Sequence, residues 1–140
     1  MSHESPHLTK IEHLGIAVRD LEQAETMYTQ LLGVPPYKRE EVASEGVITS
    51  FFKAGPNKIE LLQATREDSA IAKFIEKRGE GLHHVAYAVE DIVAELERLK
   101  GEGFRLIHEV PKPGADDKMI AFLHPKSTHG TLIELIGNRE

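Results

Sequence analysis

Cysteine is absent from the 140-residue chain, which excludes both disulfide bonds and thiolate metal sites. Any metal ion must therefore be held mainly by His, Asp, Glu or Gln side chains. No apolar run approaches the roughly 20 residues that a membrane-spanning helix needs. The first ten residues are polar and contain no apolar segment of the kind found in secretory signals, so a cytoplasmic location and no membrane partner are expected.

Basic clusters are missing as well. The formal net charge is −6 and no basic block stands out, so a nucleic-acid partner is not expected. An anionic small molecule is still compatible with this composition, because local charge decides such binding. The hydrophobic content of 40% and charged content of 29% are typical of a soluble globular protein, and 140 residues suit one domain.

What the chain does contain is an internal repeat. Residues 13–18 read His-Leu-Gly-Ile-Ala-Val, and residues 84–89, which start 71 positions later, read His-Val-Ala-Tyr-Ala-Val. Near the end of each copy a second echo follows, with Lys-Ile-Glu-Leu-Leu at 58–62 and Thr-Leu-Ile-Glu-Leu-Ile at 131–136. A repeat of this kind constrains the architecture before any single residue is interpreted.

Each copy predicts the same order of elements. Alternating apolar residues predict a strand at the start of each copy, and Asp20 and Asp91 are predicted N-caps of the helices that follow. Further strands are predicted around Tyr37–Val42, Val47–Lys53, Lys58–Leu62, Phe104–Glu109, Met119–Leu123 and Thr131–Ile136. A helix over Asp68–Gly79 connects the copies. The predicted fold class is therefore α+β, with two tandem β-α-β-β-β modules.

The predicted division of the chain follows from this pattern. Residues 1–9 form a flexible tail, 10–66 the first module, 67–80 the helical connector and 81–137 the second module, all within one domain.

A matched set of polar residues points to metal chemistry. Each copy has a His near its start and a Glu near its end, namely His13 with Glu60 and His84 with Glu134. Each Glu lies between two large apolar residues, so if those face the core, the Glu shares the other strand face with the His. A lone His or Glu is usually exposed or hydrogen-bonded. Four in matched positions predict a site for Zn, Ni, Co, Mn or Fe.

The other histidines are given weaker assignments. His83 is adjacent to His84 but on the opposite strand face, so it is not predicted to be the same kind of ligand. His124 and His129 lie in a late loop, where a solvated side chain is the more common outcome.

These segments resemble the vicinal oxygen chelate (glyoxalase-like) superfamily, and within it the methylmalonyl-CoA epimerase family. The similar stretches are Ile11–Val18, Leu31–Val34, Lys58–Leu62, Ser69–Phe74, Gly81–His84, Phe122–Lys126 and Gly130–Leu135. The resemblance implies a curved, half-closed, eight-stranded barrel around a divalent metal ion such as Co, Zn, Ni or Mn. It implies His13, Glu60, His84 and Glu134 as ligands, with Gln in place of Glu60 in some epimerases.

The resemblance also implies a reaction, the interconversion of (R)- and (S)-methylmalonyl-CoA by proton transfer through a metal-stabilised enediolate. Glu134 is the implied base on one face. Where some epimerases carry a second catalytic Glu, this chain has Thr49, and Glu45 just upstream is the nearest carboxylate. An acyl-CoA substrate and a homodimer are the implied partners, with Lys126 as a candidate cation for the CoA portion.

Three alternatives stay open at this point. A glyoxalase I-type lyase acts on a thiol hemithioacetal with a similar ligand set. A ring-cleaving dioxygenase uses two His and one Glu with iron, and Glu60 as a fourth ligand speaks against it. A non-catalytic binding protein of other specificity is disfavoured because the full ligand set is present.

Overall fold

The structure is a computed structural model that describes residues 7–138. None of the helices within that range is long and apolar enough to cross a membrane. The predicted tail over 1–9 lies outside the described residues as far as residue 6, whereas the first strand, β1 (Leu8–Ala17), already begins at Leu8. Leu8 packs on an apolar cluster and the Thr9 hydroxyl donates to the Ala88 carbonyl at 3.2 Å, so the strand includes the end of the predicted tail.

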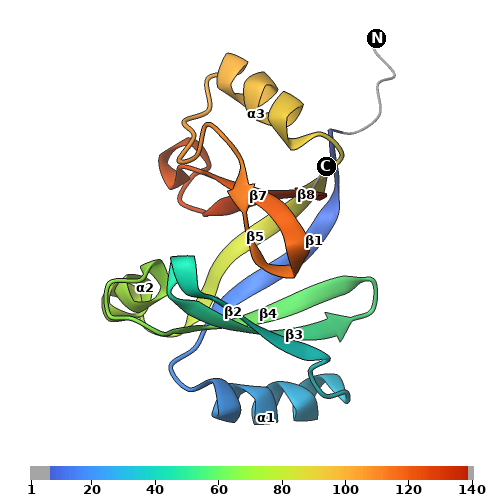
Figure 1. Cartoon of the computed structure of the whole chain (residues 1–140), viewed down its shortest axis with the longest axis vertical. Helices are drawn as coiled ribbons and strands as arrows, with labels where there is room; N and C mark the ends of the chain where they lie inside the picture. Colours follow the sequence, from blue (N-terminus) through green and yellow to red (C-terminus); the bar gives the residue numbers. More distant parts are fainter. Residues whose placement is uncertain (1–6, 139–140) are drawn as a thin grey trace. The chain divides into compact units, whose positions relative to one another are not determined.

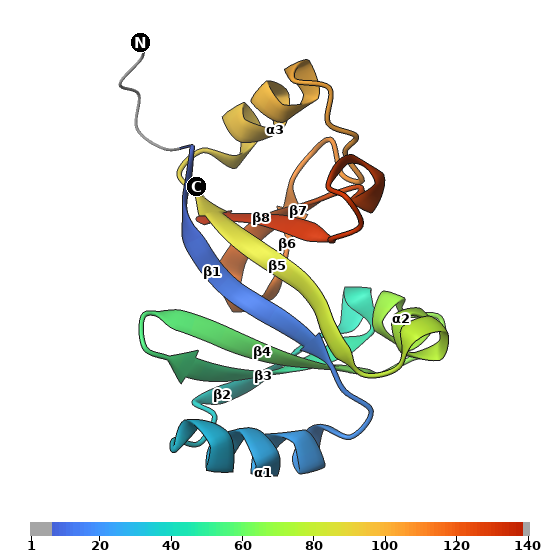
Figure 2. The same cartoon turned by 180° about the vertical axis from the view of Figure 1, so that it is seen from behind.

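Two compact units make up the chain. One is His13–His84, and the other combines the residues up to Glu12 with those from Val85 onward. β1 and β5 (Gly81–Val89) run next to each other, as Figure 2 shows, and both cross the boundary. Each unit therefore contains a part of both strands.

The unit His13–His84 has a sheet in the order β2-β3-β4-β1-β5. Its further elements are α1 (Leu21–Leu32), β2 (Lys38–Val42), the 3-10 helix η1 (Ala43–Glu45), β3 (Val47–Ala54), β4 (Asn57–Ala64) and α2 (Ala70–Arg78). β1 and β4 are parallel, while β3 is antiparallel to both β2 and β4. α1 lies along one face of these strands in Figure 1.

Strand alternation separates the two faces of this sheet. The face toward α1 is an apolar core, built on the buried residues Val18, Leu21, Phe52 and Leu61. The opposite face carries the residues that alternate with the core-facing ones along each strand, including His13, Gly15 and Glu60. A shift of one residue would exchange these faces, so the apolar pattern fixes which side chains face away from the core.

Local capping agrees with the sequence. The Asp20 carboxylate accepts the Gln23 N–H at the start of α1, and Gly33 ends the helix with a left-handed φ of 77°. The connector helix α2 is capped by Ser69 and buries Ile71 in a cluster with Ala17. The predicted helices of this unit are confirmed.

The other unit has a sheet in the order β1-β5-β8-β7-β6. Its further elements are α3 (Ile92–Gly101), β6 (Lys112–Pro113), η2 (Ala115–Asp117), β7 (Lys118–Leu123), η3 (Pro125–Ser127) and β8 (Ile133–Asn138). β5 and β8 are parallel, and β7 is antiparallel to β6 and β8. Leu96 and Leu99 of α3 pack on Leu123 and Leu135, so this helix also covers one sheet face (Figure 1).

One predicted strand is wrong. Phe104–Glu109 forms a single isolated bridge, between Leu106 and Leu123, in place of a continuous ladder. The Phe122 N–H donates to the ring nitrogen Nδ1 of His108 at 3.1 Å. The His108 side chain thus accepts the Phe122 N–H, a backbone donor that a continuous β ladder would use. The edge strand of this sheet is β6, later in the chain.

An ion pair between α1 and the sheet yields a stability prediction. Arg39 on β2 donates two hydrogen bonds to the Glu25 carboxylate, and the buried Ser50 hydroxyl donates a third. The Arg39 hydrogen bonds hold the pKa of Glu25 below its ordinary value of 4.5. A carboxyl with a lowered folded-state pKa stabilises the fold above pH 4.5, and this contribution is lost as the pH falls through the folded-state pKa.

Glu25→Gln is therefore expected to lower the free energy of unfolding at neutral pH by about 1 kcal/mol, with a smaller difference at about pH 3. Urea unfolding at both pH values measures this. The exposed Glu76→Gln is the control and should leave both values unchanged. A Glu25→Gln deficit of equal size at both pH values would contradict the role of this ion pair.

Candidate metal and catalytic site

Two buried imidazoles face each other in the unit His13–His84. The two residues are only 2% and 5% exposed, and the Nε2 atoms of His13 and His84 lie 3.0 Å apart. Two nitrogens about 2.1 Å from one ion and at right angles around it are separated by about 3 Å. The spacing of the pair therefore fits two ligands of a single metal ion.

The other nitrogen of each ring is also engaged. Nδ1 of His13 lies 3.2 Å from Oε2 of Glu60, and Nδ1 of His84 lies 2.9 Å from Nδ1 of His83. Contacts at Nδ1 direct both Nε2 atoms toward each other. Metal-binding histidines are commonly oriented by a hydrogen bond at the nitrogen that does not bind the ion.

Gly15 makes room for one of these rings. A Cβ atom built on Gly15 would lie 2.1 Å from Cε1 and 2.7 Å from Nε2 of His84. Real contacts of a Cβ atom are essentially never shorter than 3.0 Å. Gly15 thus leaves space over the sheet, and the His84 imidazole occupies that space.

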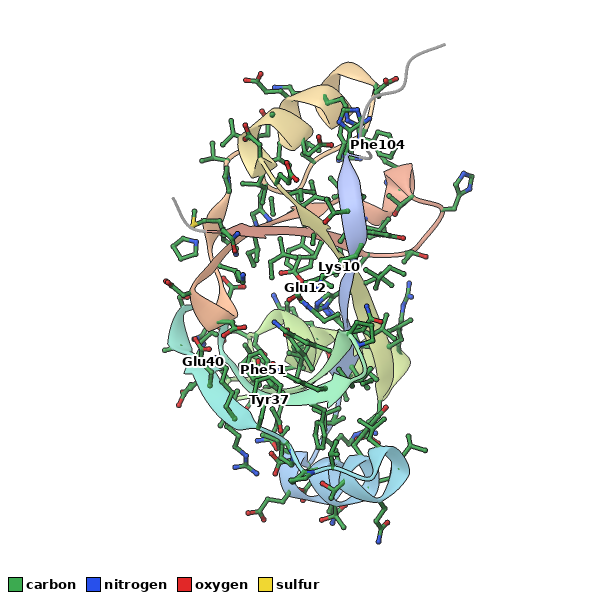
Figure 3. All side chains as sticks on the ribbon, turned by 90° about the vertical axis from the view of Figure 1, so that its right-hand side faces the viewer. Lys10, Glu12, Tyr37, Glu40, Phe51 and Phe104 are labelled. Atoms are coloured by element: carbon green, nitrogen blue, oxygen red, sulfur yellow. The ribbon has the colours of Figure 1, made fainter. Side chains whose placement is uncertain are left out.

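Glu60 stands on a sheet face that also carries the Phe51 ring. In the β ladders it is opposite Gly15 of β1 and Phe51 of β3, and residues paired in this way point to the same face. Phe51 is fully buried and its ring centroid lies 5.9 Å from that of Tyr37; both are labelled in Figure 3. Electrostatic interactions of the buried Glu60 carboxylate are therefore stronger than they would be in water.

Glu134 has the same register in the other unit. It is opposite Ala86 of β5 and Phe122 of β7, and only 5% exposed. Its neighbour Leu135 packs under α3, so Glu134 points to the opposite face. Ala86 follows His84 by two residues, as Gly15 follows His13. In both modules the Glu is thus placed beside the second residue after the His and beside a Phe.

The two phenylalanines were missed by the sequence reasoning. Phe51 and Phe122 are 71 residues apart, the same spacing as His13 and His84. That spacing could have identified them as part of the repeated site. An aromatic residue in an apolar strand is usually assigned to the core, which hid the signal.

Glu45 and Thr49 flank the turn at Gly46 that leads into β3. Glu45 is the half-buried last residue of η1. The turn is fixed by Arg66, which donates to the Ala43 carbonyl at 2.6 Å, and by the Thr65 N–H, which donates to Gly46 at 2.7 Å. Thr49 is 2% exposed and shares a strand face with Phe51, so its hydroxyl is on the site face.

The late-loop residues are a separate group. Lys126 and His129 are exposed, and His129 has a left-handed φ of 56°. Nδ1 of His124 accepts the Lys126 N–H at 3.1 Å and so caps the short helix η3. This loop leads directly into β8, the strand that carries Glu134.

Comparison with known proteins places these features in a family context. Residues 12–122 match the family described as the glyoxalase/bleomycin resistance protein/dioxygenase superfamily. The ethylmalonyl-CoA/methylmalonyl-CoA epimerase of Cereibacter sphaeroides is 42% identical over 128 residues, covering 90% of this chain and 96% of that protein.

Solved structures agree over nearly the whole length. A crystal structure of methylmalonyl-CoA epimerase from Mycobacterium tuberculosis matches with a TM-score of 0.92 at 33% identity, covering 99% of this chain and 94% of that one. A methylmalonyl-CoA epimerase in complex with methylmalonyl-CoA and NH4+ matches with a TM-score of 0.89 at 36% identity, covering 94% of this chain and 95% of that one.

Proposed function

Because the chain belongs to the glyoxalase/bleomycin resistance protein/dioxygenase superfamily, we propose that it is a metal-dependent epimerase that interconverts (R)- and (S)-methylmalonyl-CoA. The predicted superfamily resemblance and fold class, two β-α-β-β-β modules of the vicinal oxygen chelate type, are confirmed. The observation that carries the proposal is the facing Nε2 pair of His13 and His84, combined with the repeated register of the two glutamates.

His13, Glu60, His84 and Glu134 are the proposed ligands of the metal ion. The Nε2 spacing supports the two histidines, and the matching ladder positions of the glutamates support an equivalent role in both modules. In this structure Glu60 lies 3.2 Å from Nδ1 of His13, the ring nitrogen that does not face His84, so its carboxylate would bind the ion only by turning away from that contact. Nitrogen and oxygen donors of this kind suit Co, Zn, Ni or Mn. When bound, the ion supplies positive charge close to the thioester oxygen.

Epimerisation requires proton transfer on both faces of one carbon. Glu134 is the proposed base that takes the proton from the carbon between the thioester and the carboxylate. Glu45, as the carboxylic acid, returns a proton to the opposite face of that carbon, and the roles exchange for the reverse direction. Thr49 offers a hydroxyl but no carboxylate, which is why the second base is assigned to Glu45.

The reaction predicts exchange with solvent. With the metal-loaded protein in deuterated water, one stereoisomer of methylmalonyl-CoA is expected to become racemic at that carbon and to acquire deuterium there, as followed by NMR or mass spectrometry. Protein stripped with a chelator and His13→Ala protein are the controls, and both should leave the substrate unlabelled. An unlabelled substrate after prolonged incubation with the loaded wild type would contradict the function.

The same protein preparation separates the glyoxalase alternative. Turnover of methylglyoxal plus a thiol, without any labelling of the CoA ester, would favour a glyoxalase I-type lyase.

The proposal further includes a cytoplasmic homodimer and a contact between the exposed Lys126 and the CoA portion. β2 is an edge strand of its sheet, and strands in that position are the ones that can pair with a second copy of the chain.

A further inference from the structure

We infer that His83 is a positioning residue, which holds the His84 imidazole in the one tautomer and orientation that present Nε2 to the metal ion. The inference rests on the proposed metal site and adds a residue that strand alternation had set aside. Its basis is a chain of three rings in the unit His13–His84, running from the connector helix to the candidate ligand.

Successive rings in this series of three are in close contact and nearly perpendicular to one another. Phe74 of α2 contacts the His83 ring edge to face, with centroids 4.9 Å apart and an interplanar angle of 84°. The His83 ring is in turn perpendicular to that of His84, at 86°, and their Nδ1 atoms lie 2.9 Å apart. The ring of His83 is thus packed against the helix on one side and hydrogen-bonded to His84 on the other.

The chemistry of this hydrogen bond fixes the tautomers. A neutral imidazole has one N–H donor and one acceptor nitrogen, so only one of two facing Nδ1 atoms can carry the proton. If His84 binds an ion through Nε2, its lone pair must be there and its proton on Nδ1. His84 then donates to His83, whose Nδ1 is the acceptor and whose own proton is on Nε2.

The opposite tautomer of His84 would place a proton where the ion should bind. Because Nδ1 of His83 accepts a hydrogen bond, it favours the His84 tautomer with the proton on Nδ1. The same contact directs Nε2 of His84 toward Nε2 of His13, 3.0 Å away. Glu60 makes the corresponding contact with Nδ1 of His13, at 3.2 Å. Loss of such an orienting partner typically weakens metal binding 10–100-fold, as a rough range.

The test measures Co²⁺ binding rather than activity. His83→Phe keeps an aromatic ring against Phe74 but offers no acceptor, and is expected to raise the Co²⁺ dissociation constant by about 10–100-fold. His83→Asn places an amide oxygen close to the Nδ1 position and should restore affinity to within about threefold. Competition with a chromophoric chelator gives the constants, and the visible Co²⁺ spectrum reports the ligand geometry.

Controls separate the possible failures. His129→Phe, on an exposed loop, should bind Co²⁺ as the wild type does. If His83→Phe does not fold, His83→Gln replaces it, because its longer side chain moves the amide oxygen away from the Nδ1 position. If the Phe, Gln and Asn variants all bind Co²⁺ with the affinity and spectrum of the wild type, the inference is overturned and the proposed function is left intact. Absence of Co²⁺ binding by the wild type would overturn the metal site itself, and the inference with it.

Discussion

Gly15→Ala is expected to reduce metal affinity and epimerase activity by about 100-fold, through the addition of one methyl group. The new Cβ would lie 2.1 Å from Cε1 of His84, far inside any contact distance that real structures tolerate. The nearby atoms belong to a rigid ring, which is held by His83 at Nδ1 and faces His13 at Nε2. Relief therefore requires the ring to rotate out of the site or the strands to move apart.

Metal content, the Co²⁺ dissociation constant and the rate of deuterium incorporation together measure this effect. Gly101→Ala is the matched control, because a Cβ on Gly101 meets no atom within 4 Å. Gly101 ends α3, so the control is expected to fold normally and to keep full activity. Circular dichroism and thermal unfolding establish that Gly15→Ala is folded. A folded Gly15→Ala protein with wild-type affinity would show that His84 is not held where the structure places it.

Glu134→Gln is expected to lower kcat by about 10²–10⁴-fold, the usual contribution of a positioned base. Gln keeps the size and an oxygen for the metal ion, but it cannot accept the substrate proton. Glu134→Ala removes the oxygen as well, so it should also weaken metal retention. Comparing the two variants separates proton transfer from metal binding at one position.

The matched control for this pair is Glu95→Gln. Glu95 is also a buried carboxylate, at 7% exposure, but it belongs to α3 and is hydrogen-bonded to Arg98. Its replacement should change thermal stability and leave the labelling rate unaltered. Full activity in Glu134→Gln, measured by deuterium incorporation into methylmalonyl-CoA, would remove Glu134 from the mechanism.

The repeat made most of the fold predictable. The helix starts at Asp20 and Asp91 are confirmed, since each carboxylate accepts a backbone N–H three residues later. Apolar alternation was sufficient to place Glu60 on the face opposite Ile59 and Leu61, which pack under α1. These are local patterns with strong periodicity, and the sequence expresses them directly.

The wrong strand prediction at Phe104–Glu109 arose where a side chain replaced a backbone partner. Nδ1 of His108 accepts the Phe122 N–H, and the periodicity of the sequence does not predict such a hydrogen bond. His83 was set aside as a ligand because of its strand face, yet a flexible side chain brings its Nδ1 to that of His84. Strand alternation predicts the direction of each Cβ atom, but it does not predict the position that a histidine ring nitrogen reaches.

The exchange of strands between the two units has a consequence for how the chain reaches its native state. The Thr9 hydroxyl bonds to Ala88, 79 positions further along, so the second repeat obtains a neighbouring strand from the very start of the polypeptide. Closing so long a loop costs conformational entropy before any contact offsets it. Neither repeat is then a self-sufficient folding module, and a fragment cut at the connector helix would lack that strand.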